Sequence, residues 1–447
     1  MNMRKLVVVF LCCSNFIFAQ DDKKDNERME WFNDAKLGIF IHWGYYGVNG
    51  ITESWSMYHK QIPYTDYMDQ GDEFTASNYD PEAWAKLFKE VGADYSVLTT
   101  KHHDGVALWD TDFSKLNVVE KTPAGRDLVG PYVDALREND LKVGLYFSLP
   151  DWSHPDYEVV FPRPDTRKNY PQKNQKTWPA WERFVYFYKN QIKELQDNYN
   201  PDLFWFDGDW EHSPEEWRAK GLKDSLLARN PDIIVNSRLN QYGDYSTPEQ
   251  GVPVVRPEGP WEFCMTMNDN WGYYPSDTNY KPSSQIVRTF AEVIGSGGNL
   301  LLNIGPKPDG TIPQEQETRL RDLGRWIAKN DAAIHGTVAG LPYGHFYGPT
   351  TLSKDQKKLY LFMLQDPKNY ISLKGIQNKV KSIRVLGSDE ELDFVRNGGA
   401  AWNNIPGILR IDLPAKESID EYVTVLEIEL EDELELYRGH GNAVELN

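Results

Sequence analysis

Asp207 occupies the kind of position that a catalytic carboxylate needs. It ends the apolar, aromatic run Leu203–Phe206, which is typical of a buried strand, and Gly208 follows it. In a parallel barrel this carboxylate would lie at the mouth, where the glycine would let a ligand approach closely. A nucleophile or base and a cap for the next helix are equally compatible with this position. We expect Asp209 and Glu211, which follow, to be solvated loop residues.

Two glutamates further along the chain could supply a second carboxyl group. Glu249 lies in the segment Thr-Pro-Glu-Gln, and Glu262 lies in the segment Trp-Glu-Phe-Cys. Hydrolysis of a glycosidic bond needs one carboxyl group to attack or activate water and another to protonate the leaving oxygen. The structural alternatives are an ordinary loop glutamate for Glu249 and a strand residue paired with an arginine for Glu262.

Three histidines, His42, His102 and His103, also follow predicted strands. Imidazole is the commonest metal ligand in proteins. Neighbouring residues on a strand point to opposite faces, however, so only one of the adjacent pair would face a shared site unless the strand has ended. A metal site is therefore the less favoured interpretation, and we expect the histidines to hydrogen-bond a ligand or to be structural.

The elements that must position these residues form a repeated strand–helix pattern between Lys36 and Thr337. Apolar runs alternate with amphipathic stretches, as in βα units around a parallel sheet. Polar residues gather where the runs end, and barrels assemble their active sites at those ends. We predict a (β/α)8-like barrel with one irregular or missed strand. The seven candidate strands are Leu37–His42, Tyr95–Thr100, Val143–Ser148, Leu203–Asp207, Ile233–Arg238, Trp261–Met267 and Asn299–Gly305.

The pattern changes at both ends of this region. Residues 341–447 contain short strands broken by turns, which predicts a small antiparallel β-sandwich after a catalytic barrel over residues 21–340. Residues 1–20 place two basic residues before a short apolar stretch that ends in Ala19, the layout of a secretory signal. This stretch is too short to span a membrane. We expect a secreted or periplasmic protein, and the bulky residues before Cys12 and Cys13 argue against a lipid anchor.

Composition narrows the possible partners. The chain has 447 residues and a formal net charge of −19. Nucleic-acid binding needs clustered lysine and arginine, and no such cluster occurs in the sequence. Of the three cysteines, only Cys264 lies outside the predicted signal, so the mature chain has no partner for an internal disulfide. Fifteen tryptophans and 25 tyrosines suit the flat faces of sugar rings, although aromatic residues also fill cores.

Several separated segments together resemble glycoside hydrolase family 29, the α-L-fucosidases, across essentially the whole chain after the signal. Each segment alone is a weak match, but all of them occur in the order that the family shows. They are Trp31-Phe32, Gly38 to Gly44, Glu53 with Trp55, Lys101 to Gly105, Tyr146 to Ser148, Asp151-Trp152, Trp205 to Gly208, Asn236 with Arg238, and Asn299 to Pro306.

The resemblance implies that Asp207 is the nucleophile of a retaining reaction through a covalent fucosyl-enzyme, without metal or organic cofactor. A glutamate that matches either Glu249 or Glu262 would be the acid/base, and we favour Glu249. The family motif Trp-Glu-x-Cys is present around Glu262, but Pro260 replaces the lysine that often precedes it, which weakens the transfer of a role. The residues implied to line the fucose pocket are His42, Trp55, His102, His103, Tyr146, Trp205 and Arg238.

The implied substrate is a terminal α-L-fucosyl residue, removed by exo action from an oligosaccharide or polysaccharide. A glycan branch, a blood-group-type chain and a marine polysaccharide such as fucoidan all fit. Two other classes stay open. A catalytically inactive sugar-binding protein would lack a working carboxylate pair, and a metal-dependent hydrolase would need a third ligand facing the histidines.

Overall fold

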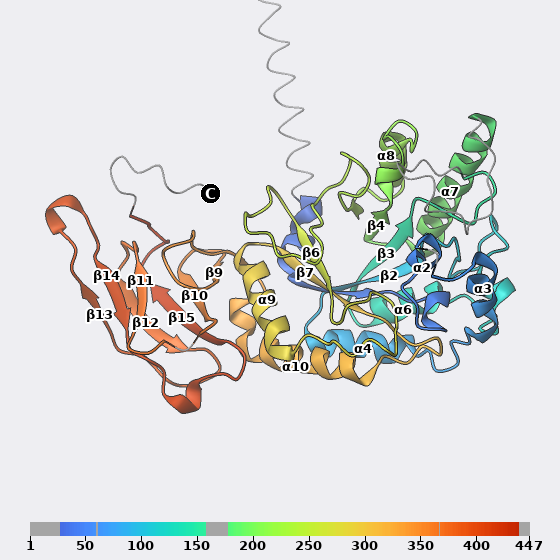
Figure 1. Cartoon of the computed structure of the whole chain (residues 1–447). Helices are drawn as coiled ribbons and strands as arrows, with labels where there is room; N and C mark the ends of the chain where they lie inside the picture. The colour runs from blue at the N-terminus through green and yellow to red at the C-terminus, as the bar shows by residue number, and fades with distance from the viewer. Residues whose placement is uncertain (1–26, 60, 158–177, 366, 438–447) are drawn as a thin grey trace, which may run out of the picture.

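The computed structural model describes residues 27–59, 61–157, 178–365 and 367–437. The predicted signal, residues 1–20, lies outside the described residues. A barrel and an antiparallel β-sandwich lie side by side (Figure 1). Among the described helices, none has the length and apolar character needed to cross a membrane.

Seven parallel strands form the barrel sheet in the order β5-β4-β3-β2-β1-β7-β6. Each coincides with a run predicted from the sequence, although β5 is much shorter than expected. Apart from Lys142, every residue in these strands is buried, which explains why they read as continuous apolar runs. Their bounds are β1 Leu37–Ile41, β2 Tyr95–Lys101, β3 Lys142–Ser148, β4 Leu203–Asp207, β5 Ile234–Val235, β6 Glu262–Thr266 and β7 Asn299–Ile304.

An irregular segment, residues 244–250, closes the barrel between β5 and β6. On one side the Asp244 amide donates to the Val235 carbonyl at 2.8 Å. On the other side the amides of β6 donate to the carbonyls of Ser246 at 2.9 Å and Pro248 at 3.1 Å. Proline has no amide hydrogen to donate, which prevents a regular ladder here. The sequence predicted one irregular or missed strand without locating it. This segment takes the place of that strand, and it carries Glu249.

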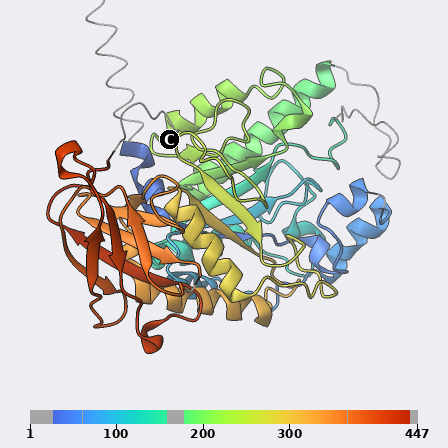
Figure 2. The same ribbon diagram turned by 60° about the vertical axis from the view of Figure 1, so that its left-hand side comes forward.

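Helices cover the outside of the barrel (Figures 1 and 2). The α4 helix follows the predicted rules: the Asp80 side chain caps the Ala83 amide at 3.0 Å, and Gly92 ends the helix in the left-handed conformation. The larger helices are α4 Pro81–Val91, α6 Val129–Glu138, α7 Trp178–Tyr199, α8 Ala219–Arg229, α9 Ser283–Gly295 and α10 Gln314–Asn330. Short helices are α2 Trp55–Tyr58, α3 Tyr64–Asp69 and α5 Val118–Lys121.

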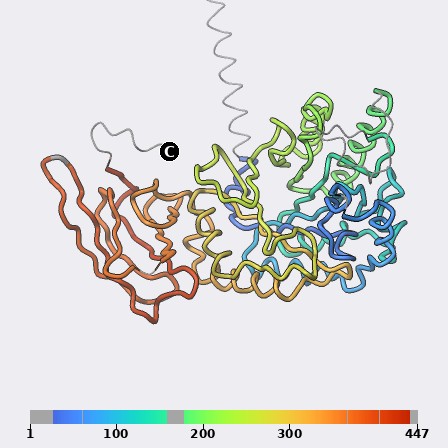
Figure 3. The backbone as a smooth tube through the Cα atoms, in the orientation of Figure 1, coloured from blue at the N-terminus to red at the C-terminus, as the bar shows by residue number. Residues whose placement is uncertain are grey.

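The C-terminal sandwich has two antiparallel sheets, in the orders β12-β15-β10-β9-β8 and β11-β14-β13. Leucine and isoleucine side chains from both sheets form its core. The Trp326 indole of α10 donates to the Val423 carbonyl at 2.8 Å and ties the sandwich to the barrel. Figure 3 shows the chain leaving the barrel after α10 and staying on one side of it. The strands are β8 Thr337–Ala339, β9 Thr350–Ser353, β10 Lys358–Met363, β11 Ile371–Lys374, β12 Val380–Val385, β13 Phe394–Asn397, β14 Ile408–Ile411 and β15 Thr424–Leu430.

Candidate active site

Asp207 ends β4 at the carboxyl edge of the barrel sheet, and both of its carboxylate oxygens are held. Oδ1 accepts a hydrogen bond from Nη1 of Arg238 at 2.8 Å, and Oδ2 accepts one from the Tyr146 hydroxyl at 2.9 Å. The Nε2 atom of His103 lies 3.5 Å from Oδ2. The Asp207 side chain is 11% exposed. The carboxylate is thus fixed in orientation while one part of it still reaches solvent.

Gly208 is required here by packing within the protein. Its φ is +83°, in the region that favours glycine. A Cβ at this position would lie 2.3 Å from side-chain atoms of Pro150. The close approach that demands glycine is therefore made by the neighbouring loop after β3. This packing fixes the turn that immediately follows Asp207.

Arg238, just after β5, joins the first carboxylate to a second. Its Nη2 atom donates to Oε2 of Glu249 at 2.5 Å, while Nη1 holds Asp207. The Glu249 side chain is 36% exposed, against 11% for Asp207. One guanidinium thus holds a buried carboxylate and a more accessible one.

Glu262 lies elsewhere. It is the first residue of β6, at the amino end of the strand, and its side chain is fully buried. Oε1 accepts a hydrogen bond from Nε1 of Trp205 at 2.9 Å, and Oε2 accepts one from the Tyr95 hydroxyl at 2.5 Å. Burial raises the pKa of Glu262 to about 7. This glutamate therefore lies inside the barrel, beneath the residues that hold Asp207.

The three histidines gather beside Asp207. Because β2 ends at Lys101, His102 and His103 follow the strand, and their ring centroids lie 4.4 Å apart. The Nδ1 atom of each histidine has a hydrogen-bond partner. His42 is paired with Oδ1 of Asn303 at 2.6 Å. His102 is paired with the Ser54 hydroxyl and His103 with the Ser148 hydroxyl.

Burial disfavours the charged form of two of these imidazoles, those of His42 and His102. Burial lowers the pKa of His42 to about 4 and that of His102 well below its usual range. Within the described ranges, no group of three or more histidine, cysteine, aspartate or glutamate side chains is placed to hold a metal.

Tryptophans flank the histidines. The Trp55 ring lies edge-on to His103, with centroids 5.3 Å apart, and Trp271 packs against His42 at 4.9 Å. Trp205 is only 1% exposed and lies below this wall, with the Arg238 guanidinium 4.6 Å from its ring centroid. Trp271 was not predicted; its only sequence signal was an aromatic residue beside a glycine in a polar loop.

Glu53 belongs to the same region, although the sequence assigned it no role. It is buried, and its Oε1 accepts a hydrogen bond from the Gly272 amide at 2.6 Å. Burial raises the pKa of Glu53 to about 7. This contact fixes the loop that carries Trp271.

The expectation that Asp209 and Glu211 are solvated is wrong for Glu211, which is buried, whereas Asp209 is half-buried. Glu211 is 6% exposed and accepts hydrogen bonds from the Trp152 indole at 3.2 Å and from the Tyr157 hydroxyl. Oδ2 of Asp209 accepts from the Asn240 amide at 2.6 Å. The short 3-10 turn Asp209–Glu211 directs both carboxylates back into the protein. They fix the loops around the site.

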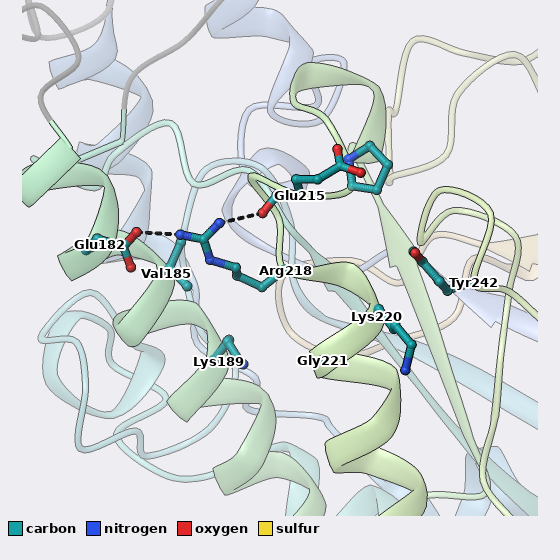
Figure 4. A pocket seen from close by; sticks show the side chains of 9 residues that line it. Glu182, Val185, Lys189, Glu215, Arg218, Lys220, Gly221 and Tyr242 are labelled. Atoms are coloured by element: carbon teal, nitrogen blue, oxygen red, sulfur yellow. Dashed lines mark hydrogen bonds and ion pairs between the residues drawn. The ribbon is translucent and has the colours of Figure 1, made fainter.

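A separate hollow of about 480 Å³ lies between α7 and α8. Arg218 spans one side of it, donating to the Glu182 carboxylate at 2.5 Å and to the Glu215 carbonyl at 2.7 Å (Figure 4). None of its lining residues was a predicted site residue. They are Glu182, Val185, Lys189, Pro214, Glu215, Arg218, Lys220, Gly221 and Tyr242.

Comparisons with known proteins agree with the motifs. Residues 14–332 match the family model described as alpha-L-fucosidase. Human tissue alpha-L-fucosidase is 33% identical over 334 residues, which cover 69% of this chain and 69% of that protein.

Solved structures agree as well. Alpha-L-fucosidase isoenzyme 1 from Paenibacillus thiaminolyticus has a TM-score of 0.82 and 34% identity, covering 92% of this chain and 100% of that one. A family 29 α-L-fucosidase from Bacteroides thetaiotaomicron, solved as a trapped covalent intermediate, has a TM-score of 0.79 and 26% identity, covering 90% and 96%. The chain therefore belongs to glycoside hydrolase family 29, the α-L-fucosidases, and is a glycosidase that acts on α-L-fucosyl residues.

Proposed function

We propose that this enzyme is an exo-acting, retaining α-L-fucosidase in which Asp207 is the nucleophile and Glu249 the acid/base. The observation that carries the proposal is the guanidinium of Arg238, which binds both carboxylates through adjacent nitrogens. Retaining glycosidases keep their carboxyl groups about 5 to 5.5 Å apart, whereas inverting enzymes leave about 6.5 to 9.5 Å for a water molecule. Two carboxylates on one guanidinium favour the closer spacing.

In the first step Asp207 attacks C1 of the fucosyl residue. A bond forms from a carboxylate oxygen to C1 as the bond from C1 to the aglycone oxygen breaks, and Glu249 gives that oxygen its proton. The donors Arg238 and Tyr146 keep the attacking carboxylate in one orientation. Glu249 is the more exposed of the two acids, so it can exchange its proton with solvent and reach a leaving group.

In the second step water hydrolyses the β-linked ester. Glu249, now ionised, takes a proton from the water molecule. The oxygen of that water forms a bond to C1 as the bond between C1 and Asp207 breaks. Two inversions leave the product in the α configuration. The covalent intermediate trapped in the related Bacteroides thetaiotaomicron enzyme supports this route.

The histidines and tryptophans suit the recognition of one terminal sugar. A neutral imidazole whose Nδ1 is already engaged offers Nε2 for a hydrogen bond with a hydroxyl group. His42 and His102 are of this kind, since burial lowers the pKa of both. With Trp55 and Trp271 at the sides, this buried wall supports a narrow pocket and therefore exo action.

Azide distinguishes the roles of the two carboxyl groups. With an activated aryl α-L-fucoside, Glu249→Ala should form the intermediate and then need an external nucleophile. Azide should restore its turnover and give α-L-fucosyl azide. In Asp207→Gly, azide should attack the substrate directly and give the β-azide. Proton NMR separates the two anomers.

Glu262→Ala is the matched control for this experiment. We expect no azide rescue, because Glu262 is buried at the amino end of β6. If Glu262→Ala yields α-L-fucosyl azide and Glu249→Ala does not, the acid/base is Glu262. A β-azide from Glu249→Ala would contradict both assignments.

A further inference from the structure

The proposed reaction gives no task to the buried acid Glu262. Glu262 is fully buried, yet both of its oxygens accept hydrogen bonds, from the Trp205 indole at 2.9 Å and from the Tyr95 hydroxyl at 2.5 Å. An indole N–H can only donate, so inside a protein it needs an acceptor to hold one ring orientation. Glu262 is that acceptor for Trp205.

Both hydrogen-bond donors of the nucleophile rest on the Trp205 ring. The Arg238 guanidinium lies 4.6 Å from the ring centroid. The Tyr146 ring is stacked on it, with centroids 5.6 Å apart and planes inclined by 19°. These two side chains hold the two oxygens of Asp207. The position of the nucleophile therefore depends on the orientation of one buried indole.

We infer that Glu262 is a positioning residue, which orients Asp207 by fixing the Trp205 indole on which Arg238 and Tyr146 rest. The inference rests on the proposed role of Asp207 as nucleophile. It gives Glu262 no contact with substrate and no proton transfer. Phe40 supports the same indole from the barrel interior, with ring centroids 5.0 Å apart, so loss of Glu262 should reorient the ring without emptying the core.

Tyr95 provides a matched control. Its hydroxyl donates to the other oxygen of Glu262, and its ring packs against Trp31 and Phe32 at the amino end of the barrel. Tyr95→Phe therefore removes one hydrogen bond to Glu262 and leaves the bond to Trp205. If Glu262 only stabilised the amino end of the barrel, Tyr95→Phe and the Glu262 variants should have similar kcat values.

The test measures kcat and KM on an aryl α-L-fucoside. Small misplacement of a catalytic group can lower the rate by about a hundredfold. We expect Glu262→Leu to lower kcat at least about twentyfold, with KM changed much less. Glu262→Gln keeps an acceptor for the indole and should retain at least about a third of kcat, and Tyr95→Phe should stay within about threefold.

The second measurement is whether the kcat losses from changing Glu262 and Trp205 depend on each other. Trp205→Phe removes the indole N–H, so adding Glu262→Leu should cause little further loss of kcat. If Glu262→Leu does not fold, the test is a comparison of Trp205→Phe with Tyr95→Phe. Only Trp205→Phe should lower kcat.

Two results for Glu262 would overturn the inference: a normal kcat in a folded Glu262→Leu, or a kcat in Glu262→Gln as low as that in Glu262→Leu. Two results for Trp205 would also overturn it. One is a kcat loss in the double variant Trp205→Phe/Glu262→Leu equal to the product of the two single losses, and the other is an equal kcat for Trp205→Phe and Tyr95→Phe. Failure of Asp207→Gly to give β-L-fucosyl azide would instead remove the nucleophile assignment. If the β-azide forms and the coupling is absent, only the positioning role fails.

Discussion

The Asp207 site and the hollow between α7 and α8 both contain arginine–carboxylate pairs, but their surroundings differ. The Arg238 and Asp207 side chains are 17% and 11% exposed, whereas those of Arg218 and Glu182 are 40% and 53% exposed (Figure 4). Exposed ion pairs contribute about 0 to 1 kcal/mol. The arginine–carboxylate pair at Asp207 is therefore buried and oriented, whereas the pair in the hollow is in contact with solvent.

The difference originates in the elements that carry the pairs. Asp207 and Tyr146 lie on β4 and β3, whose backbones are hydrogen-bonded on both sides within the sheet. Glu182 lies on the outer face of α7, and Arg218 precedes α8. The hydrogen-bonded strands hold the Asp207 and Tyr146 side chains in fixed positions, whereas the Glu182 and Arg218 side chains are exposed to solvent.

The largest expected effect is that of Asp207→Asn. The amide cannot attack C1, so kcat should fall at least about a thousandfold, or about 4 kcal/mol of barrier, with the fold retained. Steady-state kinetics on an aryl fucoside and circular dichroism check this. Glu182→Gln in the hollow is the matched carboxylate control. Near-normal turnover of a folded Asp207→Asn would end the nucleophile assignment.

Glu249→Ala should come next. General acid catalysis contributes about a hundredfold or more, so release of fucose from an oligosaccharide should fall by that factor. Formation of the intermediate from an aryl fucoside with a good leaving group should fall far less. Glu258→Ala, an exposed glutamate in the following loop, should match the wild type. Equal losses on the two substrates would argue against an acid role for Glu249.

Glu262 should give a pH-dependent difference in stability. Its pKa is about 7 in the folded protein because of burial, against about 4.5 for an ordinary glutamate. The native state therefore holds the proton between these values, and the wild type should lose stability relative to Glu262→Gln as pH rises from 4.5 through 7. The shift corresponds to a change on the order of 3 kcal/mol in the free energy of unfolding. Denaturant unfolding at pH 5 and pH 8 measures it, and a constant difference between the two proteins would contradict this reasoning.

The smallest effect is expected in the hollow. Glu182→Gln breaks an exposed ion pair, so activity should stay within about twofold and the free energy of unfolding within about 1 kcal/mol. The same kinetic and denaturation assays apply. A tenfold loss of activity would show that the hollow belongs to the functional site.

Much of the barrel was predictable because its strands are buried on both faces. Seven continuous apolar runs, such as Leu203–Asp207, became the seven parallel strands. The closing segment 244–250 was not identifiable as a strand. It contains Pro248 and lacks an apolar run, and its pairing exists only because β5 and β6 lie on either side of it.

The site was predictable where residues follow strands and less so where loops meet. Asp207 and Arg238 were found from strand ends. Glu249 and Glu262 both stayed open as the second carboxyl group, and only the structure places Glu262 at the amino end of β6. The contact between Glu53 and the Gly272 amide joins residues 219 positions apart, which no local pattern reveals.

The most direct test of the central claim is the identity of the residue that bonds to the sugar. A 2-fluoro-fucosyl fluoride should trap the intermediate. The fluorine at C2 slows both steps, and the fluoride leaving group at C1 restores the rate of formation but not the rate of hydrolysis. Digestion and mass spectrometry should then place the added mass on the peptide that contains Asp207, and on Asp207 itself after fragmentation. A label on Glu53, Glu249 or Glu262, or turnover without any covalent adduct, would contradict the proposed mechanism.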